Sequence, residues 1–353
     1  MGRQSIHFQG EIFMKKNVSR FFTGLCIASL FIVASCFVGV QTAHAQVAAM
    51  VLQSNGTTLQ KTGQHLLSGQ QTANGFLGQA DSCGSGYGNA AWVNYIGRQN
   101  SLGFVGTNQE VLGQALDIDS YGVQLGTDLY RSRRSQFGVL FDYEGFITSF
   151  DGNDLLESDN FSGGIYYAHV FANNSDFRAL AKFGTSQHHA VGDTHKVDSD
   201  SFNAVFEYGK RYFPVQNISL RPYAAFDVNY AYLGADEVAD VAFRGTKLSQ
   251  TYFRVGTDLI AQIRRFTVKA DISYSVDLVS GRLDVWTNDL GNVPGWRNDD
   301  LHIGRQIASV GLTGQYDFNR RNALFASFGL DAFFDRDSRP YQSTGVVGYS
   351  LVW

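Results

Sequence analysis

The sequence predicts an all-β protein, a twelve-stranded antiparallel transmembrane β-barrel of the outer-membrane type. Three observations predict it: an aromatic last strand, an export signal at the N-terminus, and connections that alternate between short and long. In the last strand, the face that begins at Tyr341 is apolar and aromatic, and the face that begins at Gln342 is small or polar. Such a strand, ending in Trp353, is typical of a barrel with lipid on its outer side.

The N-terminus predicts export. A basic stretch, Met14–Lys16, precedes the apolar run 21–40, and a small-residue pattern ends at Ala45. We expect residues 1–45 to be an N-terminal extension and a signal peptide that is cleaved after Ala45. Two alternatives remain open. Cys36 lies in a segment that resembles a lipobox, and the run 21–40 is long enough to be retained as a membrane anchor.

The composition fits an exported protein. Residues 1–45 hold four basic residues and one acidic residue, so 24 Lys and Arg remain against 31 Asp and Glu. This mildly acidic balance gives no electrostatic case for nucleic acid as a partner. Cys83 alone would remain, and a single thiol makes neither an internal disulfide nor a zinc cluster. Many Gly and aromatic residues with only 4 Pro suit long strands.

Twelve segments are long enough to cross a bilayer as tilted strands, which need about 9–11 residues. The alternation is clearest late in the chain, where Phe266, Ile272 and Val276 share an apolar face opposite Lys269 and Asp271. The predicted strands are 90–100, 120–130, 137–149, 160–171, 177–188, 199–213, 218–233, 249–263, 266–278, 306–318, 323–333 and 341–353. Segment 160–171 alternates least well. A soluble β-sandwich also has one buried and one wet face, but the three observations together favour the membrane barrel.

The predicted connections alternate in length. The short ones are 131–136, 172–176, 214–217, 264–265 and 319–322. The longer ones are 101–119, 150–159, 189–198, 234–248, 279–305 and 334–340. Outer-membrane barrels have short periplasmic turns and longer outer loops, so we expect both ends of the barrel domain, residues 89–353, to lie in the periplasm.

Several local motifs resemble one family. Trp92 in Ala91–Gly97 is similar to the first strand of the C-terminal β-domain of autotransporters, the type V secretion proteins. Further similar segments are Tyr121–Asp128, Phe137–Val139, Arg221–Phe226 and Arg254–Leu259, and the resemblance covers about residues 85–353. It implies the bacterial outer membrane as the location and outer-membrane lipid as the surroundings. It also implies a last strand recognised by the barrel-assembly machinery through Tyr349, Leu351 and Trp353, with periplasmic chaperones as earlier partners and a monomeric barrel.

The chain departs from this family ahead of the barrel. An autotransporter carries a long exported passenger there, whereas only residues 46–88 are available here, and they show no solenoid repeat. We expect this segment to be a linker, a helix in the pore or a plug. Two functions remain open: secretion or surface display of the segment, or a passive channel or structural outer-membrane protein with a plugged lumen.

Charged residues on the predicted strands should point into the lumen, because a charge facing lipid near the midplane costs about 2–4 kcal/mol. The acidic candidates are Asp128, Asp142, Glu144, Glu207, Asp227, Asp258, Asp271, Asp277, Asp317 and Asp331. The basic candidates are Arg178, Lys182, Arg221, Arg254 and Lys269. This excess of acidic residues would favour cations in an open pore.

Catalytic and metal sites are weakly indicated, and we expect neither an enzyme nor a cofactor. His188, His189 and His195 fall near Asp193 in a predicted outer loop, where a metal site is conceivable but solvated histidines are the simpler interpretation. No adjacent Ser/His pair on the strands supports a lipase. The one Asn-Asn pair, Asn173–Asn174, lies in a predicted periplasmic turn, so we expect no self-cleavage of the kind some autotransporters show inside the barrel.

Overall fold

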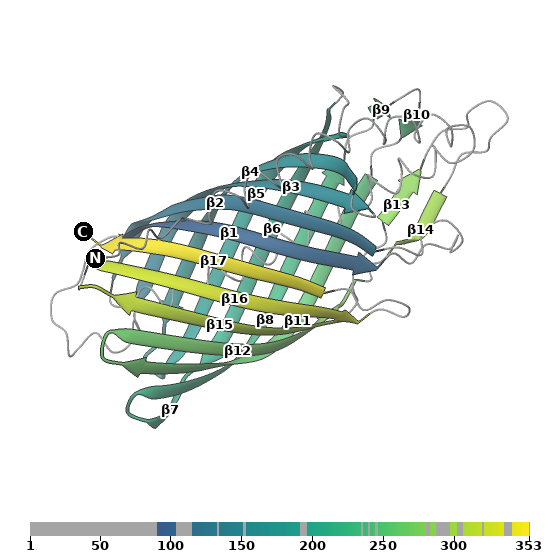
Figure 1. Ribbon diagram of the computed structural model, residues 1–353. Helices are drawn as coiled ribbons and strands as arrows, with labels where there is room; N and C mark the ends of the chain where they lie inside the picture. The colour runs from purple at the N-terminus through teal and green to yellow at the C-terminus, as the bar shows by residue number, and fades with distance from the viewer. Residues whose placement is uncertain are drawn as a thin grey trace, which may run out of the picture.

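Twelve long strands close into an antiparallel barrel in the computed structural model (Figure 1). β1 (Ala90–Gly103) pairs with β17 (Tyr341–Val352), in register from Ala90 opposite Val352 to Ser101 opposite Tyr341, and this pairing closes the sheet. The structure describes residues 90–103, 115–132, 134–150, 153–190, 196–233, 236–238, 241–243, 246–279, 283–286, 297–301, 306–319, 321–334 and 341–352. The predicted fold class is confirmed.

The other long strands correspond one to one with the predicted segments. They are β2 (Ala115–Arg131), β3 (Ser135–Phe150), β4 (Asn153–Val170), β5 (Ser175–Ala190), β6 (Val197–Lys210), β8 (Ile218–Leu233), β11 (Thr246–Ile263), β12 (Phe266–Asp277), β15 (Gln306–Asp317) and β16 (Asn322–Phe334). Short strands were not predicted. They are β7 (Tyr212–Val215), which pairs with β8, and the hairpins of β9 (Asp236–Val238) with β10 (Val241–Phe243) and β13 (Leu283–Trp286) with β14 (Arg297–Leu301).

Two predicted boundaries were wrong. The predicted loop 150–159 is mostly strand, because β3 runs to Phe150 and β4 begins at Asn153. The sequence there is mostly polar and places Leu155 and Leu156 next to each other, so it lacks the alternation by which strands were recognised. The predicted strand 199–213 is interrupted at Arg211, whose backbone N–H donates to the carbonyl oxygen of Asn174 in the adjacent turn at 2.9 Å.

The short connections gather at one end of the barrel, which we call the turn end. They are 132–134, 171–174, 211–217, 264–265 and 318–321, and β7 lies among them. Asn174 and Arg264 take left-handed backbone conformations there, with φ of 62° and 56°. β1 begins and β17 ends at this end, and the hairpins β9–β10 and β13–β14 lie at the other, the loop end (Figure 1). The predicted alternation of short and long connections therefore holds, except for the tight β3–β4 hairpin.

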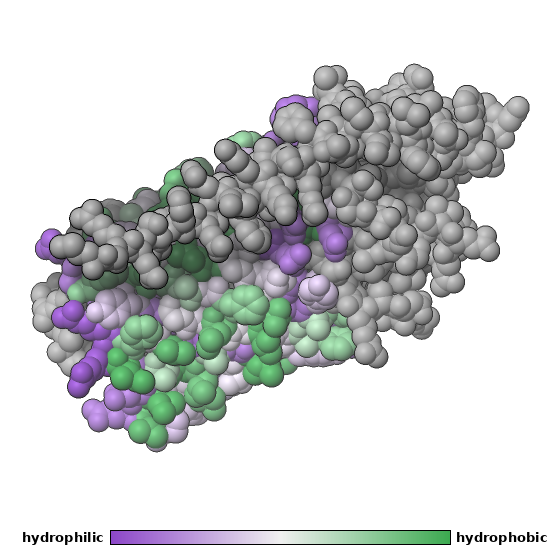
Figure 2. Space-filling view, viewed as in Figure 1, coloured by the Kyte–Doolittle hydropathy of each residue, from purple (hydrophilic) through white to green (hydrophobic). Residues whose placement is uncertain are grey.

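The two faces of the sheet differ as a lipid-spanning barrel requires. On β12, Ile272 is 62% exposed on the outer side, whereas Ser275 is 1% exposed on the inner side. Figure 2 shows apolar side chains gathered over the part of the barrel formed by the last strands, with polar side chains towards the turn end. No helix within the described residues is long and apolar enough to cross a membrane.

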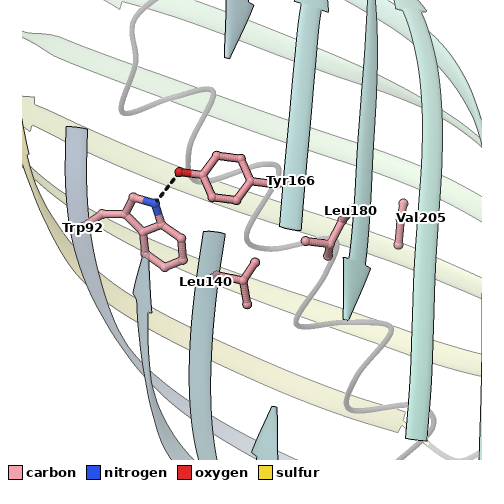
Figure 3. Packing of buried hydrophobic residues seen from close by; sticks show 5 residues of the cluster. All are labelled: Trp92, Leu140, Tyr166, Leu180 and Val205. Carbon is pink, nitrogen blue, oxygen red and sulfur yellow. Dashed lines mark hydrogen bonds between the residues drawn. The ribbon is translucent and has the colours of Figure 1, made fainter. Parts of the chain in front are cut away.

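Part of the inner side is packed with apolar side chains. Trp92, Leu140, Tyr166, Leu180 and Val205 form one buried cluster that follows β1, β3, β4, β5 and β6 (Figure 3). The Trp92 indole N–H donates to the Tyr166 hydroxyl at 3.5 Å.

Two glycines let these rings lie against the wall. A Cβ on Gly126 would stand 2.1 Å from the Trp92 ring, and a Cβ on Gly138 would stand 2.3 Å from the Tyr166 ring. Gly126 of β2 and Gly138 of β3 therefore leave the space that the two aromatic side chains occupy.

The wall is taller on one side than on the other. β12, β15 and β17 have 12 residues and β16 has 13, whereas β2 has 17 and β4 and β11 have 18. The connections at the turn end are uniformly short, so the extra residues stand at the loop end. The outward positions at the loop ends of β2, β4 and β6 carry a loop-end acidic rim, formed by Asp117, Asp119, Glu157, Asp159, Asp198 and Asp200.

Candidate functional site: the charged inner wall

The predicted lumen residues occupy the inner face. Asp271, Asp277 and Asp317 are half-buried there. The others are buried: Asp128, Asp142, Glu144, Arg178, Lys182, Glu207, Arg221, Asp227, Arg254, Asp258, Lys269 and Asp331. The period of two in each strand places them on this face, since the alternate residues carry the apolar outer surface.

The largest group of charges centres on Arg221 of β8, which is fully buried. Its guanidinium bonds Asp176 of β5 at 2.6 Å, Glu207 of β6 at 2.8 Å and Asp258 of β11 at 2.9 Å. One cation therefore joins carboxylates from three other strands. Lys269 of β12 extends the group, since its Nζ lies 3.1 Å from Asp258.

Two more arginines complete this network. Arg178 bonds Asp176 and Glu207, each at 2.9 Å. Arg254 donates to Asp227 at 3.1 Å and lies 3.5 Å from Glu207. Charge-assisted bonds of this kind are shorter and stronger than neutral ones, so β5, β6, β8, β11 and β12 are tied together across the inner wall.

Tyr223 lies between two of the guanidinium groups. The central carbons of Arg221 and Arg254 stand 5.3 Å and 5.5 Å from the centre of its ring, within the range of cation–π attraction. The ring covers Gly256, where a Cβ would approach it to 2.5 Å. Asp271 and Asp331 line a small cavity next to this network, with Ser273 and Ser309.

Smaller groups hold the first strands together. Asp142 accepts hydrogen bonds from Lys182, Ser162 and Gln124, the last at 3.2 Å. Glu144 pairs with Arg98 and accepts from the Ser120 hydroxyl at 2.7 Å.

Asp128 is the centre of a third group, next to the apolar cluster of Figure 3. It accepts from Gln136 and the Tyr166 hydroxyl at 2.7 Å each, and from the backbone N–H of Ala90 at 3.1 Å. Arg131 lies 3.7 Å away.

Sequence reasoning missed four charged members of the inner wall. Asp176 was assigned to the turn 172–176, but β5 already begins at Ser175. Arg98, Arg131 and Arg211 were not considered, although Arg98 shares the parity of the inward Trp92. These additions give three more basic residues against one more acidic residue, so the acid excess is smaller than the sequence indicated.

Two of the three histidines predicted in an outer loop lie on a strand. His188 and His189 belong to β5, and His195 lies outside the described residues. The buried His188 ring has one nitrogen 2.8 Å from the Ser158 hydroxyl and the other 2.7 Å from the Ser199 hydroxyl. Within the described part of the chain, no group of His, Cys, Asp or Glu is arranged to hold a metal ion.

The expectation that no Ser/His pair would occur on the strands was wrong. Besides the His188 group, the Ser135 hydroxyl of β3 lies 2.7 Å from Nδ1 of His169 on β4. The two residues are 34 positions apart in sequence, and only the register of β3 with β4 brings them together. Adjacency across a hairpin has no signal in the sequence unless that register is already known.

Tyr349 and Leu351 are about two-fifths exposed on the outer face of β17. Trp353 lies outside the described residues, as do the signal peptide, Cys36 and the segment 46–88. Asn173 and Asn174 lie in a turn at the turn end, the location expected for them.

Comparison with known proteins identifies several similar barrels. Residues 91–329 match the family model of the autotransporter beta-domain. The β-domain of the Bordetella autotransporter BrkA is 14% identical, with a TM-score of 0.53 over 75% of this chain and 99% of that one. The translocator domain of NalP from Neisseria meningitidis is 10% identical, with a TM-score of 0.56 over 86% and 99%. The transport unit of AIDA-I from Escherichia coli is 11% identical, with a TM-score of 0.53 over 75% and 90%. Comparison with curated proteins gives no match.

Proposed function

Because this chain belongs to the autotransporter beta-domain family and is a translocator-type barrel of the bacterial outer membrane, we propose that it carries its own N-terminal segment, residues 46–88, through the lumen to the cell surface. The observation that supports this proposal best is the inner wall, which outside the apolar cluster of Figure 3 carries many buried polar and charged side chains. An extended chain exposes backbone N–H and C=O groups, and these need polar partners or water inside a membrane.

The ion pairs of the wall suit this role. Most inward charges already have partners within the wall, as in the network around Arg221. A segment that passes through the lumen therefore contacts a hydrophilic surface with few charged groups left to bind it strongly. Segment 46–88 is itself rich in Gln, Gly, Ser and Thr and has two charged residues, Lys61 and Asp81.

We place the turn end in the periplasm and the loop end at the cell surface. Short turns face the periplasm in outer-membrane barrels, and the outward carboxylates of the loop-end acidic rim stand beyond the apolar band. The proposed partners follow from this placement: outer-membrane lipid around a monomeric barrel, and periplasmic chaperones and the barrel-assembly machinery before insertion.

We assign no catalytic role to the barrel. Both nitrogens of His188 are engaged by serine hydroxyls inside the wall, and the described hydrogen bonds give His169 no carboxylate partner to orient it as a general base. A passive channel or a structural protein with the segment as a plug is the second candidate, since part of the inner wall is filled by the cluster of Figure 3.

The deciding experiment is surface labelling of an epitope tag placed directly after Gln46 in intact cells. Surface display predicts that antibody and external protease reach the tag, while a tag in a short turn, such as 264–265, stays protected until the outer membrane is opened. A tag at Gln46 that stays protected in intact cells contradicts display and supports the plugged barrel. The tag in the turn also checks the orientation independently.

A further inference from the structure

The turn end carries exposed charge of a single sign. In the described connections of this end and at the residues beside them, the exposed charged side chains are Arg134, Lys210, Arg264, Arg265 and Arg321. The acidic residues nearby, Asp176 and Asp317, are on the inner face. On the outer face of the strands at the loop end, the loop-end acidic rim carries the opposite sign. These exposed basic residues are therefore a separate feature from the inner wall, whose charges are of both signs.

Three of these cations lie on two adjacent turns, which we call the turn-end basic patch: Arg264, Arg265 and Arg321. Nη1 of Arg265 donates to the carbonyl oxygen of Phe318 at 3.2 Å, and the Arg265 carbonyl accepts from the backbone N–H of Asp317 at 2.9 Å. These bonds tie the turn 264–265 to the turn 318–321, which holds Arg321. No ion pair among the described residues involves any member of the patch.

An aromatic surface adjoins the patch on the lipid side. The ring of Tyr316 lies 5.6 Å from the ring of Phe266 and 5.1 Å from that of Phe318. Phe266 and Phe318 are about half exposed, and Ile263 is 67% exposed. Apolar and aromatic side chains at a barrel rim lie at the level where acyl chains meet headgroups, so the cations directly beyond them lie at the level of the phosphates.

We infer that the turn-end basic patch binds the phosphodiester headgroup of an anionic phospholipid in the adjoining leaflet, with its acyl chains against Phe266, Tyr316 and Phe318. Arginine is suited to phosphate because its planar guanidinium donates two parallel hydrogen bonds. The inference rests on the barrel spanning a membrane and not on passage of a segment through its lumen.

The test uses the full mature chain refolded into nanodiscs of phosphatidylcholine with a minor fraction of phosphatidylglycerol. Native mass spectrometry then measures how much phosphatidylglycerol stays bound. For the wild type, we expect phosphatidylglycerol to be enriched among the bound lipids over its bulk fraction. The variants R264Q, R265Q and R321Q are tested singly and combined. At low salt, each charge removed should reduce the enrichment about fivefold. The lysine variants R264K, R265K and R321K should keep most of it. K196Q, which removes an exposed cation near the loop end, is the matched control and should match the wild type.

Both leaflets of these nanodiscs have the same composition, so the result does not depend on orientation or on display of the segment. Equal enrichment in wild type and the triple glutamine variant would overturn the inference. Displacement of the lipid by inorganic phosphate alone would overturn it too, since the site would then hold a free anion. If the triple glutamine variant binds lipid like the wild type but fails to assemble in cells, the patch binds an acidic protein partner instead. If the triple variant does not fold, the wild type alone still tests the proposal. Raised salt should then abolish the enrichment of phosphatidylglycerol on the wild type, and an enrichment that persists in raised salt refutes the proposal.

Discussion

Arg221 shows how much of the inner wall can depend on one side chain. It is fully buried and bonds carboxylates from three neighbouring strands. Arg221→Met would leave Glu207 and Asp258 buried with fewer cations, and breaking a buried ion pair costs about 3–5 kcal/mol. We expect a lower free energy of unfolding in denaturant titrations of the refolded barrel. Lys182→Met should cost less, because Asp142 keeps hydrogen bonds from Ser162 and Gln124. An equal loss of unfolding free energy in both variants would mean that the network around Arg221 stabilises the barrel no more than the single Lys182–Asp142 pair does.

The two faces of β12 give a second test at the scale of one residue. Ile272 faces lipid, and Ser273 faces the cavity that Asp271 and Asp331 line. Ile272→Arg should lower stability by about 2–4 kcal/mol, the cost of a cation at the bilayer midplane. Ser273→Arg should cost less, because carboxylates, among them Asp271 and Asp331, line the cavity that the new side chain would enter. Refolding into lipid vesicles with denaturant titration measures both; a larger loss for Ser273→Arg would reverse the two faces.

The inward side of a residue could be predicted from parity, but its partner could not. Asp258 and Lys269 follow from the period of two and from the cost of charge in lipid. Their contact depends on the register of β11 with β12. The same limit applies to Ser135 and His169, and to Trp92 over Gly126, where the packing comes from strands that the sequence does not align.

At the scale of the strand, β17 combines closure of the barrel with an outward aromatic surface. Tyr349 and Leu351 face outward near the turn end, while Ser350 is buried on the inner side. Replacing Leu351 or Trp353 by Asp should impair assembly in cells more than Ser350→Asp, since Leu351 faces lipid at the rim and the period of two predicts the same side for Trp353. The amount of heat-modifiable protein in outer membranes measures this. Equal assembly of the three variants would contradict a role of this surface in assembly.

Strands were predictable where they meet lipid and less so beyond it. β12 and β16 alternate cleanly because one face is apolar by necessity. The loop-end part of β4 carries mostly polar residues with Leu155 and Leu156 side by side, so the sequence at 153–159 lacks alternation and resembles a loop. The break at Arg211 likewise depends on a backbone hydrogen bond to another turn.

At the scale of the whole molecule, closure of the sheet predicts resistance to unfolding. A closed barrel has no edge strand with unsatisfied backbone groups in the membrane. The protein should therefore fractionate with outer membranes and migrate faster on gels before boiling than after it. Recovery in the soluble periplasm, or a single gel position with and without boiling, would contradict the membrane barrel.

The unequal strand lengths make the loop end of the barrel asymmetric. The turn end is level, whereas the loop end descends from β2, β4 and β11 to β12, β15 and β17, by five or six residues of strand. At about 3.3 Å per residue and a tilt of about 40°, this is a step of roughly 13–15 Å along the barrel axis. The strand wall at the loop end is therefore lower on the side of β12, β15, β16 and β17 than on the opposite side. If segment 46–88 passes through the lumen as proposed, the taller wall of β2, β4 and β11 confines it on one side of the loop end as it leaves.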